Sequence, residues 1–167
     1  MFRILCLALA LSGGLLARDT LVVLLRHAEK ARKGDTAPLS EAGHRRAASL
    51  PGRLAAFAPS ALFASNLRRS QQTLEPLSRA LALPLQVYER GEERALAQRI
   101  IALYSGTQVV VCAHSDTLWV LMEALGHQPP FREVSGFDRY WILRMEEGSN
   151  RVTLQEHRQE PTAEPNG

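Results

Sequence analysis

Residues 20–30, TLVVLLRHAEK, decide the fold of this chain. The apolar part, Thr20 to Leu25, runs without polar alternation, is partly β-branched, and stops abruptly at Arg26 and His27. A short apolar run of this kind is typical of a strand buried on both faces, and such strands belong to parallel sheets that helices cover. The stretch therefore predicts a buried strand with polar side chains at its carboxyl end.

Two further apolar runs end in the same way. Residues 61–64 lead into a polar cluster at 65–73, and residues 109–113 form the clearest strand and lead into His114. A shorter strand is expected at 85–88, a hairpin at 140–145 and 151–156, and helices at 41–57, 74–81, 92–104 and 118–125. Alternating strands and helices predict an α/β fold: a three-layer α/β/α sandwich with a mainly parallel central sheet.

The composition excludes several classes of protein. The 167 residues suit one domain, and 46% hydrophobic and 22% charged residues are close to soluble globular averages, which argues against disorder and against a multi-span membrane protein. The basic residues are scattered and aromatic residues make up only 6%, so we expect no nucleic-acid partner.

The amino terminus has the pattern of an export signal. Arg3 precedes an uncharged apolar run, Ile4 to Ala17, which is shorter than the roughly 20 residues that a spanning helix needs. We expect a signal peptide at 1–17, cut after Ala17 rather than Ala10, with an uncleaved anchor as the alternative. The predicted mature protein is then periplasmic, without a stable membrane span, and consists of one domain at 18–159 and a disordered tail at 160–167.

The carboxyl ends of parallel strands are where ligands bind in such sheets. Three predicted strands bring polar groups to this edge: Arg26 and His27, either Arg68 or Arg69, and His114. A histidine can attack phosphorus and form a phosphohistidine, and arginines with a cationic histidine stabilise the phosphoryl oxygens. We expect His27 to be the nucleophile, and Arg26, Arg69 and His114 to hold the phosphoryl group.

The same residues resemble the motifs of the histidine phosphatase superfamily, in its phosphoglycerate mutase-like branch. Arg26-His27-Ala28-Glu29, residues 38–43 (PLSEAG), residues 65–73 (SNLRRSQQT) and residues 109–117 are similar to successive family motifs. The family motif has a serine, three residues and an arginine, and this resemblance selects Arg69 over Arg68. The resemblance, which extends to small exported lipopolysaccharide core heptose phosphatases and to phosphohistidine phosphatases, implies the family's fold without a large cap insertion, an intermediate on His27, and no metal or other cofactor.

The general acid is less sharply defined than the nucleophile. The resemblance implies a glutamate after the third strand, for which Glu89 is the first candidate, and Asp116 is the second. Ser65 and Asp116 are also predicted to contact the substrate. An acid is needed for a poor leaving group such as an alkoxide, and less so for a phosphoramidate or an anhydride.

The predicted function is hydrolysis of a phosphorylated small molecule or a phosphorylated envelope component by a phosphoric monoester hydrolase. A phosphoryl-binding protein with little turnover and a mutase-type phosphotransferase are the alternatives. If both histidines titrate near the ordinary pKa of about 6.5, a bell-shaped pH profile is expected.

Overall fold

The computed structural model describes residues 18–159, so the predicted signal peptide and tail lie outside the described residues. The sheet contains β1 (Thr20–Arg26), β2 (Ala61–Ser65), β3 (Leu85–Tyr88), β4 (Gln108–Ala113), β5 (Arg139–Met145) and β6 (Val152–Arg158). The strand order is β3-β2-β4-β1-β5-β6, with the first four strands parallel and the hairpin β5–β6 antiparallel. The predicted mainly parallel sheet with a carboxyl-terminal hairpin is confirmed.

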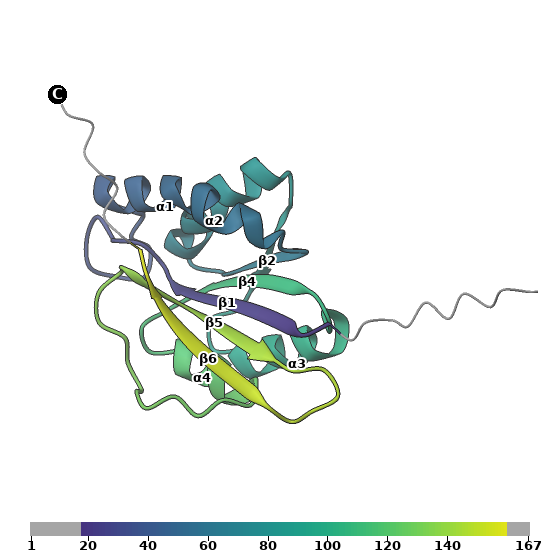
Figure 1. Cartoon of the computed structure of the whole chain (residues 1–167). Helices are drawn as coiled ribbons and strands as arrows, with labels where there is room; N and C mark the ends of the chain where they lie inside the picture. Colours follow the sequence, from purple (N-terminus) through teal and green to yellow (C-terminus); the bar gives the residue numbers. More distant parts are fainter. Residues whose placement is uncertain (1–17, 160–167) are drawn as a thin grey trace, which may run out of the picture.

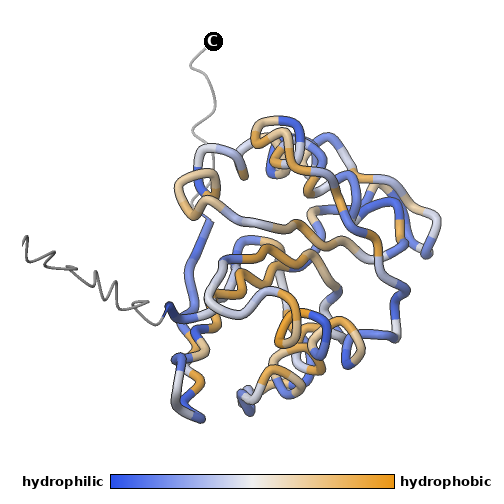
Figure 2. The backbone as a smooth tube through the Cα atoms, turned by 90° about the vertical axis from the view of Figure 1, so that its right-hand side faces the viewer, coloured by the Kyte–Doolittle hydropathy of each residue, from blue (hydrophilic) through white to orange (hydrophobic). Residues whose placement is uncertain are grey.

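Helices cover both faces of this sheet (Figure 1). On one face, α1 (Glu41–Leu54) and α2 (Arg68–Leu81) bury leucines against the strands, and on the other α3 (Glu93–Leu103) and α4 (Leu118–Ala124) do the same. Figure 2 shows the hydrophobic chain concentrated in the interior and the hydrophilic chain around it. The three-layer α/β/α sandwich is confirmed, and no large insertion interrupts the described chain.

The start of α1 is fixed by local chemistry. Ser40 caps the helix, and its Oγ accepts a hydrogen bond of 3.1 Å from the amide of Gly43. Gly43 packs so closely on the backbone of Glu29 that an added Cβ would lie 2.3 Å from the Glu29 carbonyl oxygen. The helix continues through Pro51 to Leu54 and then tightens into a short 3-10 turn, which accounts for the predicted span to residue 57.

The register of the parallel strands brings the predicted site residues together. Arg26 pairs with Ala113, and the amide of His27 donates to the Ala113 carbonyl at 3.0 Å, so His27 and His114 follow neighbouring strands at one level. On the other side of β4, Ala64 pairs with Cys112, which brings Ser65 to the same level. Pairing alone therefore places both histidines and Ser65 at one edge of the sheet.

Candidate active site

The two histidines form the centre of this edge. His27 is 3% and His114 2% exposed, and their ring centroids lie 5.2 Å apart with the planes inclined by 57°. A third ring, that of Phe137, lies 6.0 Å from the His27 ring. The imidazoles are therefore close enough to contact one tetrahedral group held between them, and they are largely shielded from water.

The ring of His27 is oriented by its own backbone. Its Nδ1 lies 2.7 Å from the carbonyl oxygen of Ala28. A carbonyl oxygen only accepts hydrogen bonds, so Nδ1 carries the proton of the neutral ring and Nε2 keeps a free electron pair. The amide of Ala28 in turn donates to Thr73 Oγ1 at 3.0 Å, and that hydroxyl donates to the Arg69 carbonyl at 2.7 Å, so α2 holds this backbone in place.

His114 is held between a serine and an arginine. Its Nε2 lies 2.7 Å from Ser65 Oγ, and its Nδ1 lies 3.4 Å from Nη2 of Arg69. Ser65 is fully buried and follows from the strand register, whereas Arg69 comes from the first turn of α2. Ser65, which the sequence predicts to contact the substrate, has its hydroxyl against His114.

Arg69 is the buried member of the arginine pair. It is 4% exposed and lies next to His114, whereas Arg68 is exposed on the other side of the first turn of α2. Its guanidinium also donates to the Asp35 carbonyl at 2.9 Å and to Asp35 Oδ1 at 3.3 Å. Asp35 lies in the loop before α1, and its side chain is 70% exposed. The contact with Asp35 was not foreseen, because a single acidic residue in a polar loop carries no periodic signal.

One nitrogen of the Arg26 guanidinium is hydrogen-bonded to the loop before β5. Nη1 donates to the carbonyls of Val134 and Gly136 at 3.1 and 3.0 Å, and the guanidinium lies 4.2 Å from the centroid of the Phe137 ring. The loop therefore forms one wall of the site, on the side of β1. The sequence did not point to this wall, because residues 134–137 match no helical or strand pattern.

The two candidate acids lie at the rim, and each has a partner. Glu89 follows β3 and accepts a hydrogen bond from the side-chain amide of Asn66. Asp116 pairs with Arg90 at 2.6 Å. Both carboxylates are exposed. The structure places them near strand ends of the same edge, as the chain order requires, with neither contacting a histidine directly in the hydrogen bonds of the described residues.

Burial and positive neighbours lower the pKa of both histidines. Burial is the larger cause for His27, whose pKa is about 4 despite the opposing hydrogen bond to Ala28; Arg69 and Arg26 lower it further. Burial, then His27 and Arg69, lower the pKa of His114 to about 3. The expected pKa values near 6.5 are therefore wrong for this site, because the sequence could not show how completely both rings are buried. Both rings are neutral at pH 7 in the unoccupied site.

No group of three or more histidine, cysteine, aspartate or glutamate side chains within residues 18–159 could hold a metal ion. Likewise, no helix in that part of the chain is long and apolar enough to cross a membrane. What the edge does offer is a set of groups suited to a tetrahedral oxyanion: two arginines, a neutral imidazole with a free electron pair, and a second imidazole beside Arg69.

The fold and this set of residues define an α/β/α protein with two histidines and two arginines at the carboxyl edge of its parallel strands. The family model of the histidine phosphatase superfamily (branch 1) matches residues 22–97, which include most of β1 and all of α1, β2, α2 and β3. This match confirms the resemblance to the histidine phosphatase superfamily that the sequence motifs indicated. No curated protein sequence matches the chain.

Solved structures share the fold at low sequence identity. The protein histidine phosphatase SixA complexed with tungstate is 21% identical, with a TM-score of 0.67 over 83% of this chain and 97% of that one. A mycobacterial glucosyl-3-phosphoglycerate phosphatase is 16% identical, with a TM-score of 0.67 over 86% and 99%. A further mycobacterial hydrolase is 16% identical, with a TM-score of 0.68 over 89% and 94%. At these identities the likeness establishes the fold.

Proposed function

We propose that the protein is a phosphatase that passes the phosphoryl group of its substrate through a covalent intermediate on Nε2 of His27. The observation that carries this proposal is the orientation of His27: Nδ1 donates to the Ala28 carbonyl at 2.7 Å, so the free electron pair lies on Nε2. The lowered pKa of about 4 keeps that electron pair available at neutral pH. A nucleophile that is both oriented and unprotonated is what phosphoryl transfer to a side chain requires.

The reaction then divides into two displacements. In the first, Nε2 of His27 forms a bond to phosphorus while the bond from phosphorus to the leaving oxygen breaks, and that oxygen takes up a proton. In the second, a water molecule attacks phosphorus and gives a proton to the group that protonated the leaving oxygen, the bond to His27 breaks, inorganic phosphate leaves, and the neutral imidazole returns. In both steps the phosphoryl oxygens carry most of the negative charge.

Three side chains are available to stabilise that charge. Nη2 of Arg69 lies 3.4 Å from Nδ1 of His114, and the guanidinium of Arg26 lies against Phe137, whose ring is 6.0 Å from that of His27. An arginine guanidinium donates two parallel hydrogen bonds to a phosphoryl group, and positive groups fixed in advance need little reorganisation during the reaction. Two of the solved structures with this fold contain tungstate or a vanadium oxyanion, which supports the use of such oxyanions as probes.

For the leaving group, we propose Glu89 as the general acid, with Asp116 as the alternative. Glu89 is exposed and its partner is the neutral side chain of Asn66, so its carboxyl group can gain or lose a proton without breaking an ion pair. Asp116 would first have to leave Arg90. We therefore expect Glu89→Gln to slow an alkyl phosphate more than an activated aryl phosphate, because only the alkoxide needs the proton. Equal slowing of both substrates would remove Glu89 from this role.

The covalent intermediate is tested by rapid quenching. The protein is mixed with a 32P-labelled activated phosphomonoester and quenched in alkali, and the acid-labile label is followed over time. We expect labelled wild-type protein and no label on His27→Asn, with His44→Asn as a matched control because His44 is exposed on α1. A label of equal size on His27→Asn would overturn the assignment of the nucleophile.

A phosphoryl-binding protein with little turnover is a second candidate, because both candidate acids have partners at the rim. Turnover of an activated phosphomonoester separates the two functions. Hydrolysis at an ordinary enzymatic rate, above about one per second, would exclude the binding protein. Tungstate binding without hydrolysis would favour it.

We also propose that the protein acts on phosphorylated compounds outside the cytoplasm, on the basis of the apolar run from Ile4 to Ala17 after Arg3. Expression of the full chain in a bacterium with an outer membrane, followed by fractionation and amino-terminal sequencing, tests this. A periplasmic product that begins at Arg18 is expected. An uncut membrane-bound product would support the anchor instead, and an uncut cytoplasmic product would overturn export.

A further inference from the structure

Ser65 is the most completely engaged hydroxyl at this edge of the sheet. It is the last residue of β2 and is fully buried. Its Oγ lies 2.7 Å from Nε2 of His114 and 2.9 Å from Ser70 Oγ, and it accepts a longer hydrogen bond of 3.4 Å from the amide of Leu67. A serine hydroxyl has one proton to donate and two electron pairs to accept with. Three neighbours therefore fill its whole capacity.

The direction of these hydrogen bonds follows from the other side of His114. Nη2 of Arg69 lies 3.4 Å from Nδ1, and a guanidinium can only donate. Nδ1 must therefore be the unprotonated nitrogen of the neutral ring, which leaves the proton on Nε2. Ser65 accepts this proton and passes its own to Ser70. The opposite arrangement would set two donors, Nδ1–H and Arg69, against each other.

We propose that Ser65 is a positioning residue for His114, which holds the Nε2–H tautomer and so keeps Nδ1 as the nitrogen that meets the phosphoryl group. This assignment rests on the proposed function of the site. When the oxyanion binds, its oxygens accept the hydrogen bond of Arg69 in place of Nδ1, and His114 takes up one proton from solvent on Nδ1. Nε2 keeps the same hydrogen bond to Ser65 in the neutral and in the cationic ring. The site therefore gains a charged donor without any rotation of the imidazole.

Because of the charges around His114, we expect this imidazole to become protonated only when the anion binds. The titratable and charged groups that face it are Arg26 at the end of β1, His27 directly after it, Arg69 on α2, and Arg90 before α3. All of them are cationic or neutral, so they oppose a positive charge on His114 while the site is unoccupied. A bound dianion reverses this balance. Ser65 contributes by fixing which nitrogen is protonated, and with its capacity filled it has no hydrogen bond left for a substrate oxygen.

The tautomer can be observed without any turnover. In the full-length protein labelled with 15N-histidine, two-dimensional NMR at pH 7 separates the Nε2–H form, the Nδ1–H form and the doubly protonated ring. We expect the neutral Nε2–H form of His114 in the free protein and the doubly protonated ring when tungstate is added. A neutral Nδ1–H ring in the free wild-type protein would overturn the proposal, whatever the variants do.

Variants separate positioning from a merely structural role. Ser65→Ala should lose the pure Nε2–H form and lower kcat/KM about tenfold to hundredfold, the range of a hydrogen bond to a charged group. Ser65→Thr keeps the hydroxyl and should restore the Nε2–H form. Ser70→Ala is the matched control, because Ser70 contacts Ser65 and not His114; it should leave the tautomer unchanged and kcat/KM within about threefold.

Two results would count against Ser65 as a positioning residue. One is an unchanged tautomer in a folded Ser65→Ala protein, with folding checked by circular dichroism. The other is an equal loss of kcat/KM in Ser65→Ala and Ser70→Ala, which would indicate a purely structural effect. The failure of the proposed function is recognised separately: absent hydrolysis and absent phosphoenzyme in wild-type protein reject the phosphatase, whereas the tautomer of His114 is still measured.

Discussion

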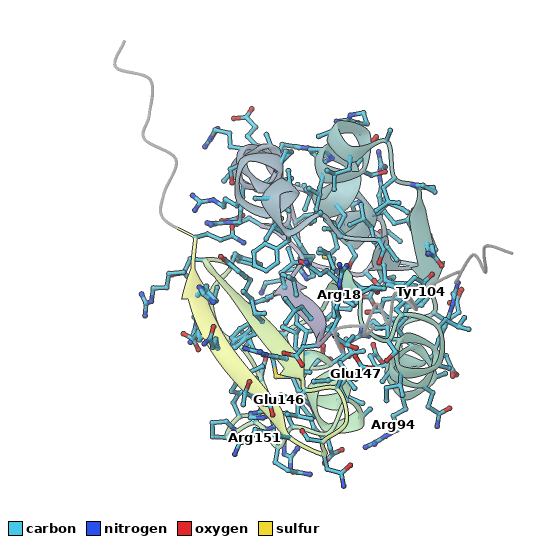
Figure 3. The ribbon with its side chains drawn as sticks, turned by 45° about the vertical axis from the view of Figure 1, so that its right-hand side comes forward. Arg18, Arg94, Tyr104, Glu146, Glu147 and Arg151 are labelled. Atoms are coloured by element: carbon cyan, nitrogen blue, oxygen red, sulfur yellow. The ribbon has the colours of Figure 1, made fainter. Side chains whose placement is uncertain are left out.

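Polar residues at the two ends of the parallel strands are stabilised in opposite ways. At the amino ends, Thr20 accepts from the Gly106 amide at 2.9 Å, and Asp19 binds the Glu147 amide and pairs with Arg144. Figure 3 shows Arg18 and Glu147 side by side at this end, where the Arg18 amide donates to the Glu147 carboxylate. At this end the charges that stabilise one another are of opposite sign.

At the carboxyl ends the charged groups that act on the two histidines are mostly cationic, whereas the carboxylates of Glu89 and Asp116 lie at the exposed rim. Arg26 and Arg69 both lower the pKa of His27, and His27 and Arg69 lower that of His114. The one carboxylate on Arg69, that of Asp35, has an exposed side chain. A cluster of this kind lowers the free energy of unfolding of the free protein. Binding of an anion would neutralise the cluster and would therefore be favourable. The comparison therefore separates an end that stabilises the fold from an end that we propose to bind the substrate.

The largest effect is expected from Arg69. Arg69→Gln removes a buried cation next to His114 and should lower kcat/KM for an activated phosphomonoester about a thousandfold, the lower range for a cation that stabilises phosphoryl transfer. Arg68→Gln is the matched control, because Arg68 is exposed on the same turn, and its kcat/KM should stay within about threefold. Equal losses in the two variants would show that net charge rather than the buried position matters.

Low pH should lower the free energy of unfolding through the two buried histidines at the carboxyl ends of the strands. The folded pKa values, about 4 for His27 and about 3 for His114, lie below the unfolded value of about 6.5, so the unfolded chain binds more protons between these limits. The free energy of unfolding therefore falls as the pH drops below about 6.5, by on the order of 2 kcal/mol for each histidine at pH 5.

This acid dependence is measured by urea unfolding at pH 7 and pH 5. We expect the difference between the two pH values to shrink in His27→Gln, because that variant has one buried histidine fewer. A saturating concentration of tungstate should shrink it too, by raising the folded pKa of His114. A wild-type free energy of unfolding that is equal at both pH values would show that the rings are not held neutral by burial.

Much of this site follows from the sequence, for a definite reason. The apolar strands before His27 and His114 set the register, and in a parallel sheet the register alone makes the two histidines neighbours. The residues alone left Arg68 and Arg69 open, and the resemblance to the family's serine-to-arginine motif selected Arg69. Fold and central residues are thus coded by short, regular patterns.

The loops around the site could not be predicted in this way. Asp35 reaches Arg69 from the loop before α1, and Val134 and Gly136 reach Arg26 from the loop before β5. These contacts join residues that are far apart in the chain and lie in irregular loops. Such loops lack the repeat of apolar residues from which helices and strands are predicted. The pKa values of the histidines depend on how completely such loops exclude water, so these values could not be predicted from the sequence either.

Two glycines of α1 test how closely the backbone under the site is packed. Gly43→Ala places a Cβ 2.3 Å from the Glu29 carbonyl, two residues after His27, and should lower the free energy of unfolding by about 2 kcal/mol. Gly52 has open space around it, so Gly52→Ala should raise the stability by roughly 0.5–1 kcal/mol through helix propensity. Urea unfolding of both variants gives the comparison. Equal changes in the two would mean that the contact with Glu29 yields easily.

A smaller effect is expected from Asp35. Asp35→Asn removes the carboxylate that competes for Arg69 and leaves the Asp35 backbone carbonyl in place. Because the Asp35 side chain is 70% exposed and solvent screens its charge, we expect tungstate or phosphate to inhibit only about two- to fivefold more tightly. Inhibition constants at low and high salt provide the measurement, and the difference should narrow at high salt. Weaker inhibition in the variant would mean that Asp35 orients Arg69 for the anion instead of competing with it.

The smallest effect on activity should come from the other end of the strands. The hydrogen bond from the Glu147 amide, followed by Arg144, lowers the pKa of Asp19, so Asp19 stays ionised at pH 5 and its contribution to stability is lost only as the pH falls through that lowered value. Asp19→Asn should therefore leave kcat/KM within about twofold and leave unchanged the loss of stability between pH 7 and pH 5. A variant that lost activity as Arg69→Gln does, or that lost the acid dependence, would show that the two ends act as one unit, and the division between a stabilising end and a binding end would fail.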